Sequence, residues 1–333
     1  MSQTILEQPQ VESSVHRKSI FERFKGSQTT PLAMIFLAIS LVLSLSSDVF
    51  LTETNLFSVG RQASINGLLS LGMTFVIIGG GIDLSVGAVV ALVSSLVVIM
   101  ANHGLPVVVV LAGALLAGAV FGLVSGIMVS RFEITPFIAT LAGLCAYRGA
   151  VLIITDGSPI TFNHFSPALN YIGNGLVGPV PFPLIILVVM AVLCHLMATR
   201  TRFGLHIFAL GSSEEAARLS GIITKRVQCL TYVLSGFLCG IAALIMTARV
   251  NSSQPTAGEL FELDAIAAAV IGGTSMTGGI GSVPGAMLGV AIFGIIGNGL
   301  NLLNVSSYWQ YVIRGVIIAL AVGIDTYRNR RRK

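Results

Sequence analysis

Two carboxylates, Asp83 and Asp264, are the main acidic residues inside the long apolar runs of this sequence, and both lie near the ends of those runs. Carboxylates in such positions relay protons or bind sodium ions in ion-coupled transporters. Because the runs contain so few of them, the sequence weakens an ion-coupled mechanism without excluding it. The sequence also contains no Gly-Lys-Ser or Gly-Lys-Thr triplet, so it has no P-loop with which to bind ATP.

Other reactive groups show no catalytic or metal-binding arrangement. The four cysteines lie within or at the edges of apolar runs, without the spacing of a metal site. No pattern typical of a Ser-His-Asp hydrolase or a His-Glu-x-x-His metalloprotease is present. We therefore expect no catalytic residue, no metal site and no cofactor in this chain.

A polar, basic segment over residues 199–228 separates two groups of apolar runs, and its residues 215–221 read Glu-Ala-Ala-Arg-Leu-Ser-Gly. In a chain that is 54% hydrophobic and only 10% charged, a polar loop of this length indicates a partner on the water side. The pattern alone fits two interpretations equally well. One is a helix that docks such a partner, and the other is an amphipathic helix that lies on the lipid headgroups.

The local chemistry of this segment predicts a short helix over residues 214–219. Ser212 or Ser213 can cap it, because a serine oxygen accepts hydrogen bonds from the free amides of a first turn. The two glutamates of that turn suit the positive end of the helix dipole. Gly221 can end the helix in a left-handed conformation.

The composition is that of a membrane protein. A mean hydropathy of +0.89 and 37 glycines in 333 residues lie outside the range of ordinary soluble chains. The apolar runs are continuous rather than alternating, which argues against a transmembrane β-barrel. The net charge of +5 comes from residues beside these runs, so we expect contact with membrane lipid and no nucleic-acid partner.

The predicted fold is all-α, a polytopic membrane protein with about ten transmembrane helices, some of which can be discontinuous or re-entrant. The apolar runs before the polar segment cover residues 31–51, 62–82, 84–101, 105–130, 134–154 and 182–198. Those after it cover residues 229–248, 263–279, 283–303 and 309–325. The short connection at Asp83 leaves a re-entrant hairpin open.

Most of the 19 lysines and arginines gather in three places: a polar tail over residues 1–30, the segment 199–228, and a basic tail over residues 328–333. Since basic residues concentrate on the cytoplasmic side of membrane spans, we predict that all three are cytoplasmic. Even numbers of apolar runs separate them, as a common side requires. The membrane domain then covers residues 31–327, and residues 155–181 form the main external loop.

Three consecutive glycines, Gly79, Gly80 and Gly81, each disfavour helix by about 1 kcal/mol relative to alanine, so we expect the helix to break there. A discontinuous helix could line a water-filled pathway, with Asp83 or Ser85 capping the next helix. Alternatively, the glycines form a tight turn at the cytoplasmic edge with Asp83 as an ordinary N-cap. The predicted topology favours the turn.

Isolated polar residues within the apolar runs are candidates for contact with a transported solute. We predict a substrate pathway that includes Asn66, Thr74, Tyr147 and Asn298. No motif supports any one of them, and polar side chains in membrane helices more often bond a neighbouring helix than a ligand. Each therefore has a structural interpretation beside the functional one.

Two stretches resemble a known family. Residues 72–88 read Gly-Met-Thr-Phe-Val-Ile-Ile-Gly-Gly-Gly-Ile-Asp-Leu-Ser-Val-Gly-Ala, and residues 262–274 read Glu-Leu-Asp-Ala-Ile-Ala-Ala-Ala-Val-Ile-Gly-Gly-Thr, followed by Gly-Gly-Ile-Gly-Ser at 278–282. The chain resembles the permease subunits of ABC importers, in the branch that carries ribose and related monosaccharides and that belongs to one superfamily with branched-chain amino acid permeases. The resemblance covers nearly the whole of residues 31–327.

By this resemblance, the segment 199–228 corresponds to the loop that such permeases present to their ATPase subunits. The implied docking residues are Glu214, Glu215, Ala216, Ala217 and Gly221. The implied family-motif or hinge residues are Gly79, Gly80, Gly81, Asp83, Ser85, Gly272, Gly273, Gly278 and Gly279.

The resemblance implies a transport subunit rather than an enzyme, located in a bacterial inner membrane and forming half of a dimeric pore. Its implied partners are an ATPase subunit that holds ATP and Mg²⁺, a periplasmic or lipid-anchored sugar-binding protein, and a second permease copy or paralogue. Alternatives stay open. They are the same machinery for a furanose signalling molecule or a branched-chain amino acid, an ion-coupled secondary transporter, and a membrane scaffold.

Overall fold

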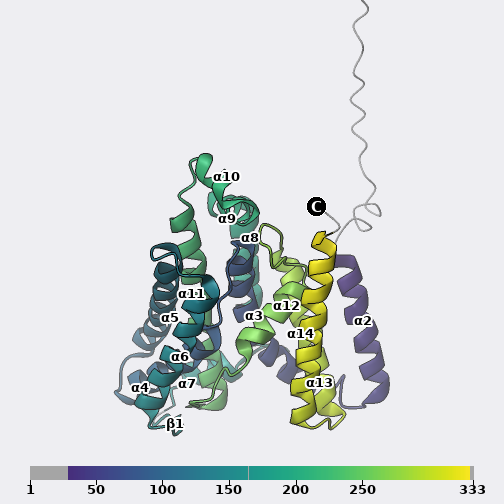
Figure 1. The fold of residues 1–333 in the computed structure, drawn as a ribbon. Coiled ribbons are helices and arrows are strands. Elements are labelled where there is room, and N and C mark those ends of the chain that lie inside the picture. The colour runs from purple at the N-terminus through teal and green to yellow at the C-terminus, as the bar shows by residue number, and fades with distance from the viewer. Residues whose placement is uncertain (1–28, 164, 331–333) are drawn as a thin grey trace, which may run out of the picture.

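The computed structural model describes residues 29–163 and 165–330, which are mainly helical (Figure 1). The helices are α2 (Thr29–Ser46), α3 (Glu53–Ile78), α4 (Val86–Asn102), α5 (Val107–Ser130), α6 (Pro136–Thr155), α7 (Pro167–Asn174), α8 (Phe182–Arg200), α9 (Arg202–Ser212), α10 (Glu214–Leu219), α11 (Thr224–Val250), α12 (Phe261–Ile271), α13 (Val283–Leu302) and α14 (Ser307–Arg330). Four two-residue strands form two antiparallel pairs: β1 (Ile160–Thr161) with β4 (Ser252–Ser253), and β2 (Leu176–Val177) with β3 (Val180–Pro181). Most of the predicted N-terminal tail, residues 1–28, and the end of the basic tail, residues 331–333, lie outside the described residues.

Six helices of the described residues are long and apolar enough to cross a membrane, namely α5, α6, α8, α11, α13 and α14. Helices α2 and α4 are apolar but shorter. The predicted span over residues 263–279 is wrong, because α12 has only 11 residues and no regular helix follows it before Val283. A helix of this length is about 16 Å long, roughly half the thickness of a bilayer's hydrocarbon core.

The molecule has two distinct ends (Figure 1). Helices α9 and α10 mark one, which we call the α10 end, and α7 and β1 mark the other, the α7 end. The first described turn of α2 and the last of α14 both lie at the α10 end. The charge pattern predicts this common side for both termini and the polar segment. That this side is the cytoplasm stays a prediction.

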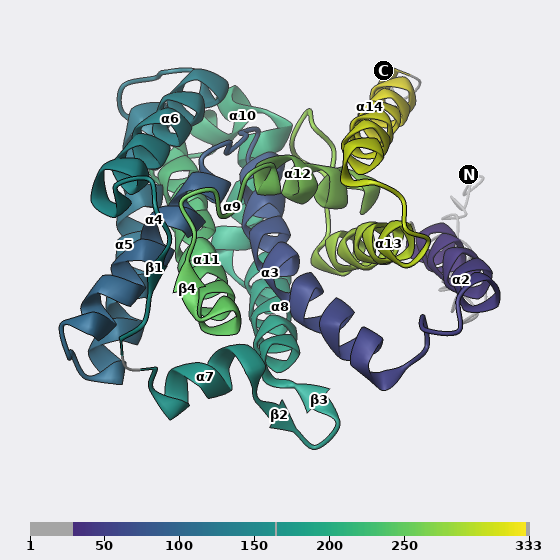
Figure 2. The same cartoon turned by 90° about the horizontal axis from the view of Figure 1, so that it is seen from below.

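Helix α11 packs closely along α5 and also contacts α3 and α4 (Figure 2). Glycines make this approach possible, since Gly118 and Gly122 of α5 lie directly against the backbone of α11 around Gly236. A Cβ atom added at Gly236 would be 2.2 Å from the carbonyl oxygen of Gly118. The small-residue spacing of α5 therefore serves packing within the chain.

Helices α3 and α12 end in the same way. Gly79 and Gly272 occupy the C-cap positions, and the next residues, Gly80 and Gly273, have left-handed φ angles of +83° and +89°. In each case the two amides after the C-cap donate to the last turn of the helix, which satisfies carbonyls that a helix end leaves free.

Most of the residues between α11 and α12 are buried or half-buried, and they form no helix. Arg148 of α6 donates to the carbonyl oxygens of Pro255 at 2.7 Å and Ala257 at 2.8 Å. Such bonds matter because non-helical backbone at membrane depth must find its partners within the protein or in a water-filled cavity. They fix the place where α12 begins.

Candidate functional site

The short helix predicted in the polar segment is confirmed. Helix α10 covers Glu214–Leu219, the Ser213 hydroxyl oxygen accepts a hydrogen bond from the Ala216 amide at 3.2 Å, and Gly221 follows with a φ of +82°. Cap, first-turn acids and left-handed glycine all act over a few residues, so local chemistry is sufficient to build this element.

Helix α10 turns one side toward the rest of the molecule and the other toward solvent. Ala217 is only 3% exposed, so it packs the helix onto the body of the molecule. The other predicted docking residues are exposed: Glu214, Glu215, Ala216 and Gly221. A partner that approaches the α10 end therefore meets these four residues and not Ala217.

Two apolar side chains of this region escaped the sequence prediction. Leu219 is 78% exposed and Ile223 is 65% exposed, although both lie in a polar segment. Protein interfaces have an apolar centre with a polar rim, and these side chains offer such a centre beside the glutamates of α10. Their apolar type within a charged segment was the signal that could have revealed them.

A polar groove of about 660 Å³ lies beside α10, between it, the turn after α5 and the start of α11. Glu133 of that turn forms an ion pair with Lys225 of α11. The hydrogen bond and the charge of Lys225 hold the pKa of the Glu133 carboxyl below its ordinary value, so this glutamate is ionised at neutral pH. The groove gives the α10 end a polar, charged surface.

The corner between α9 and α10 meets the glycine-rich turns at the α10 end. The Gly279 amide donates to the carbonyl oxygen of Ile78, the last residue of α3, at 2.9 Å. A Cβ atom added at Gly211, near the end of α9, would overlap that same carbonyl, and one added at Gly278 would be 2.7 Å from the carbonyl oxygen of Gly211. The end of α3, the turn after α12 and the base of α10 are thus in direct contact.

The interpretation of Asp83 as the N-cap of the next helix is wrong. Asp83 is buried, and the N-cap of α4 is Ser85, whose side chain makes no capping bond. The Asp83 carboxylate instead accepts hydrogen bonds from the Ser85 amide at 3.0 Å, the Ser85 hydroxyl at 2.6 Å and the Ser235 hydroxyl of α11 at 3.1 Å. This carboxylate therefore fixes the turn after α3 to α11.

Replacing Asp83 with alanine should destabilise the protein by about 1–3 kcal/mol, because the buried Ser85 amide loses its acceptor. Replacing Ser235 with alanine removes one of the three bonds and should cost about 1 kcal/mol. The midpoint of heat-induced aggregation of the detergent-purified protein measures both. Equal losses in the two variants would contradict this account.

A polar cavity of about 440 Å³ lies among α3, α12, α13 and α14. Its lining includes the first half of α3, the last residue but one of α11 and the first turns of α14, so it occupies the part of the molecule nearer the α7 end. The polar residues that define it include Gln62, Asn66, Arg249, Asp264, Asn298 and Arg314. We call it the polar chamber.

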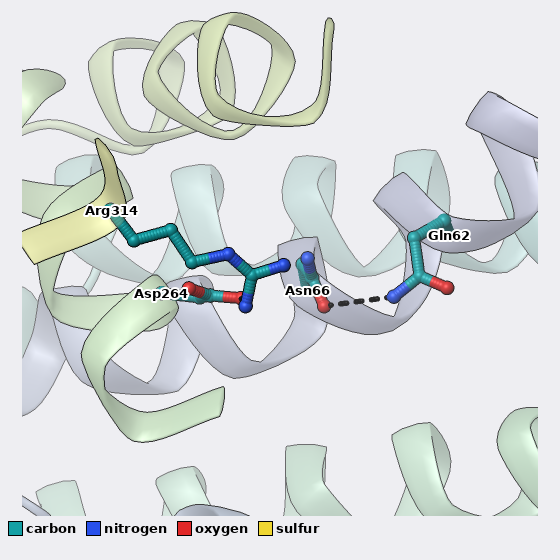
Figure 3. Close-up of polar contacts among 4 residues, drawn as sticks. All are labelled: Gln62, Asn66, Asp264 and Arg314. Atoms are coloured by element: carbon teal, nitrogen blue, oxygen red, sulfur yellow. Dashed lines mark hydrogen bonds and ion pairs between the residues drawn. The ribbon is translucent and has the colours of Figure 1, made fainter. Parts of the chain in front are cut away.

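Hydrogen bonds organise the polar chamber (Figure 3). Arg249 donates to the Gln62 side-chain oxygen at 2.9 Å, and the Gln62 amide donates to the Asn66 oxygen at 3.4 Å. Across from them, the Arg314 guanidinium and the Asp264 carboxylate form an ion pair at 3.4 Å. The chamber therefore presents amides, two guanidinium groups and one carboxylate to a solute.

The structure brings two of the predicted pathway residues together and leaves two elsewhere. Asn66 and Asn298 line the polar chamber, and Asn298 also exchanges amide hydrogen bonds of 2.7 and 3.1 Å with Asn55. The Thr74 hydroxyl donates to a carbonyl of its own helix, and the Tyr147 hydroxyl donates to a carbonyl of α5. Both of these lie away from the chamber lining.

Within the described residues, no three His, Cys, Asp or Glu side chains lie close enough together to hold a metal ion. What the site offers is a contact surface at one end and a polar chamber in the other half. Helix α3 and the turn after α12 connect the two, because α3 and α12 line the chamber while the end of α3 and Gly278–Gly279 contact the α9–α10 corner.

The chain matches known proteins over most of its length. Residues 55–322 match the family described as the permease component of branched-chain amino acid transport systems. The ribose import permease of Bacillus subtilis is 42% identical over 90% of this chain and 92% of its own length. The ribose import permease of Escherichia coli K12 is 40% identical, over 90% and 93%. The xylose transport system permease of Escherichia coli K12 is 33% identical, over 97% and 98%.

No solved structure matches the chain significantly. The family match and the relatives agree with the chain's apolar helices, and both describe a transport subunit rather than an enzyme. The chain therefore belongs to the family of membrane-spanning permease components that includes those of branched-chain amino acid transport systems.

Proposed function

We propose that this chain is the permease subunit of an ATP-driven importer that carries a ribose-like monosaccharide across a bacterial inner membrane. Relatives at 40–42% identity are named as ribose import permeases and a relative at 33% as a xylose permease, which supports a sugar as the cargo. The polar chamber supports it independently. Its volume of about 440 Å³ lies within the range of small-molecule sites, and its amides suit a solute rich in hydroxyl groups.

The contact between the α9–α10 corner and the glycine-rich turns is the observation that carries this proposal. An importer must convert the ATP-dependent movement of a separate ATPase into alternate opening of its pathway. Helix α10 is a short, exposed helix, and the turns at its base follow two helices that line the polar chamber. A rigid-body displacement of α10 would reach the chamber through Ile78 and Gly279.

Three partners follow from this function. The ATPase, which holds ATP and Mg²⁺, docks at the α10 end on Glu214, Glu215, Ala216 and the exposed Leu219. A periplasmic or lipid-anchored sugar-binding protein docks at the α7 end. A second permease subunit covers part of α14, whose apolar side chains Val312, Val316 and Leu320 are exposed, and membrane lipid covers the rest.

The same function requires a consistent topology. We propose that α2, α3, α4 and the half-length α12 cross or enter the bilayer together with the six long apolar helices, which gives about ten membrane segments. The α10 end and both termini then face the cytoplasm, as the distribution of basic residues predicts.

Uptake of radiolabelled ribose should require this chain, a separate ATPase and a binding protein together, and the omission of any one should lower the initial rate at least tenfold. An uncoupler should leave uptake unchanged in cells whose ATP level is maintained. Xylose and leucine, supplied at the same concentration, test the choice of solute.

Uptake that stops with the uncoupler despite normal ATP would contradict the importer and point to an ion-coupled transporter. Leucine uptake without sugar uptake would assign the chain to amino acid transport. If no solute is transported although all three components are present, the chain would be better explained as a membrane scaffold.

A further inference from the structure

We propose that Asp264 and Arg314 form a hydroxyl-binding pair in the polar chamber, which holds two adjacent hydroxyl groups of a sugar during its passage. This inference rests on the proposed function and names residues and chemistry for it. Helix α12, of 11 residues, supplies the carboxylate, and helix α14, of 24 residues, supplies the guanidinium. The site therefore forms where a short helix meets a long one.

The carboxylate of Asp264 is buried with spare hydrogen-bonding capacity. Its side chain is 5% exposed and one of its oxygens contacts Arg314 at 3.4 Å. Within the described residues, its other oxygen has no hydrogen-bond partner. A buried acceptor without a partner costs about 1–3 kcal/mol, and such groups in native proteins normally find a partner in water or a ligand. The free oxygen therefore points to a donor that enters the chamber.

The guanidinium of Arg314 is also only partly used. It is 34% exposed, and it extends over the Asp264 carboxylate toward Asn66 (Figure 3). A guanidinium carries five N–H donors, whereas a carboxylate only accepts. Together they can accept from one hydroxyl group and donate to its neighbour, which is the pattern that adjacent hydroxyls of a sugar require.

The surroundings of the pair favour a sugar over a simple ion. Asn66 lies beside the pair as an amide that can both donate and accept, and Phe261 and Phe293 line the same chamber. Small-molecule sites typically combine apolar and aromatic walls with a few placed polar groups. Phenyl rings can cover the C–H faces of a sugar while the pair holds its hydroxyls.

A merely structural role is the competing explanation, because the pair also joins α12 to α14. Replacing a buried ion pair with apolar side chains of similar size is often neutral for stability. The double variant Asp264→Leu with Arg314→Met therefore keeps the helices together while removing the polar groups, which separates the two roles.

Saturation-transfer NMR on the permease–ATPase complex in lipid nanodiscs, with D-ribose as the probe and leucine in parallel, tests the pair directly. The wild-type complex should transfer magnetisation to ribose. In Asp264→Asn and Arg314→Gln the apparent dissociation constant should rise at least tenfold, and in the double variant the ribose signal should be lost although the complex remains assembled. The control is Asp156→Asn, at an exposed aspartate that caps the end of α6 and is not part of the chamber lining, which should bind ribose as the wild type does.

Ribose binding by the double variant at the wild-type level would overturn the proposal and leave the pair as a link between helices. A leucine signal without a ribose signal would overturn it as well. An assembled complex that retains its ATPase but fails to bind ribose even as wild type refutes the hydroxyl-binding pair alone, whereas failure to retain an ATPase refutes the proposed importer.

Discussion

The Ala217→Asp variant should lose its ATPase subunit, with at least a tenfold drop in the amount that copurifies with the tagged permease. Ala217 is the buried residue of α10, and aspartate there would place a charge against the body of the protein. Burying an unpaired charge is far more costly than burying a neutral polar group. Helix α10 should therefore detach from the surface against which Ala217 packs, and the exposed docking residues would lose their common orientation.

The matched control for this variant is Ala168→Asp. Ala168 belongs to α7 and is exposed, so the same substitution places its charge in water at the opposite end of the molecule. An aspartate in the first turn of a helix is also favourable toward the helix dipole. This variant should retain the ATPase at the wild-type level.

A substitution on the exposed face of α10 separates the effect of direct contact with the ATPase from the effect of the helix's position. Leu219→Ser removes the exposed apolar side chain without disturbing the Ser213 cap or the left-handed Gly221, so it should weaken retention while the loop stays folded. Full retention of the ATPase by a well-folded Ala217→Asp permease would contradict docking through α10. The segment would then be better explained as a helix lying on lipid headgroups.

The docking helix could be predicted from sequence because every determinant is local. Ser213, the first-turn glutamates and Gly221 act within nine residues of one another, and the structure builds the helix with the predicted bounds. The glycine run at 79–81 also located the end of α3 correctly, since three successive glycines each disfavour helix by about 1 kcal/mol.

The burial of a segment within the fold, and the distant residues that it contacts, could not be predicted in the same way. An apolar run over 263–279 looks like a full span, yet α12 stops at Ile271 and Gly272 packs against the backbone of Gly285, a contact that depends on the next helix. Asp83 is buried and accepts a hydrogen bond from Ser235, which is 152 positions away. The Asp264–Arg314 pair likewise joins residues 50 positions apart, so no local sequence pattern predicts it.

The substitution Gly236→Ala should destabilise the folded permease by roughly 3 kcal/mol, the upper part of the range for overpacked cores. Small-residue spacings in the sequence allowed contact either within the chain or between two copies. The structure places those of α5 against α11, where a Cβ atom at Gly236 would be 2.2 Å from the Gly118 oxygen and 2.8 Å from the Gly122 amide nitrogen. Both neighbours are backbone atoms, so relief requires the two helices to move apart.

Gly149→Ala provides the matched control, because Gly149 lies within α6 and a Cβ atom there meets nothing within 4 Å. Alanine is better than glycine in a helix by about 1 kcal/mol, so this variant should be as stable as the wild type or slightly more stable. The same chemical change should thus lower the midpoint of heat-induced aggregation at one site and preserve or raise it at the other. An unchanged midpoint in Gly236→Ala would mean that α5 and α11 do not pack this closely, and the packing between these two helices would have to be reassigned.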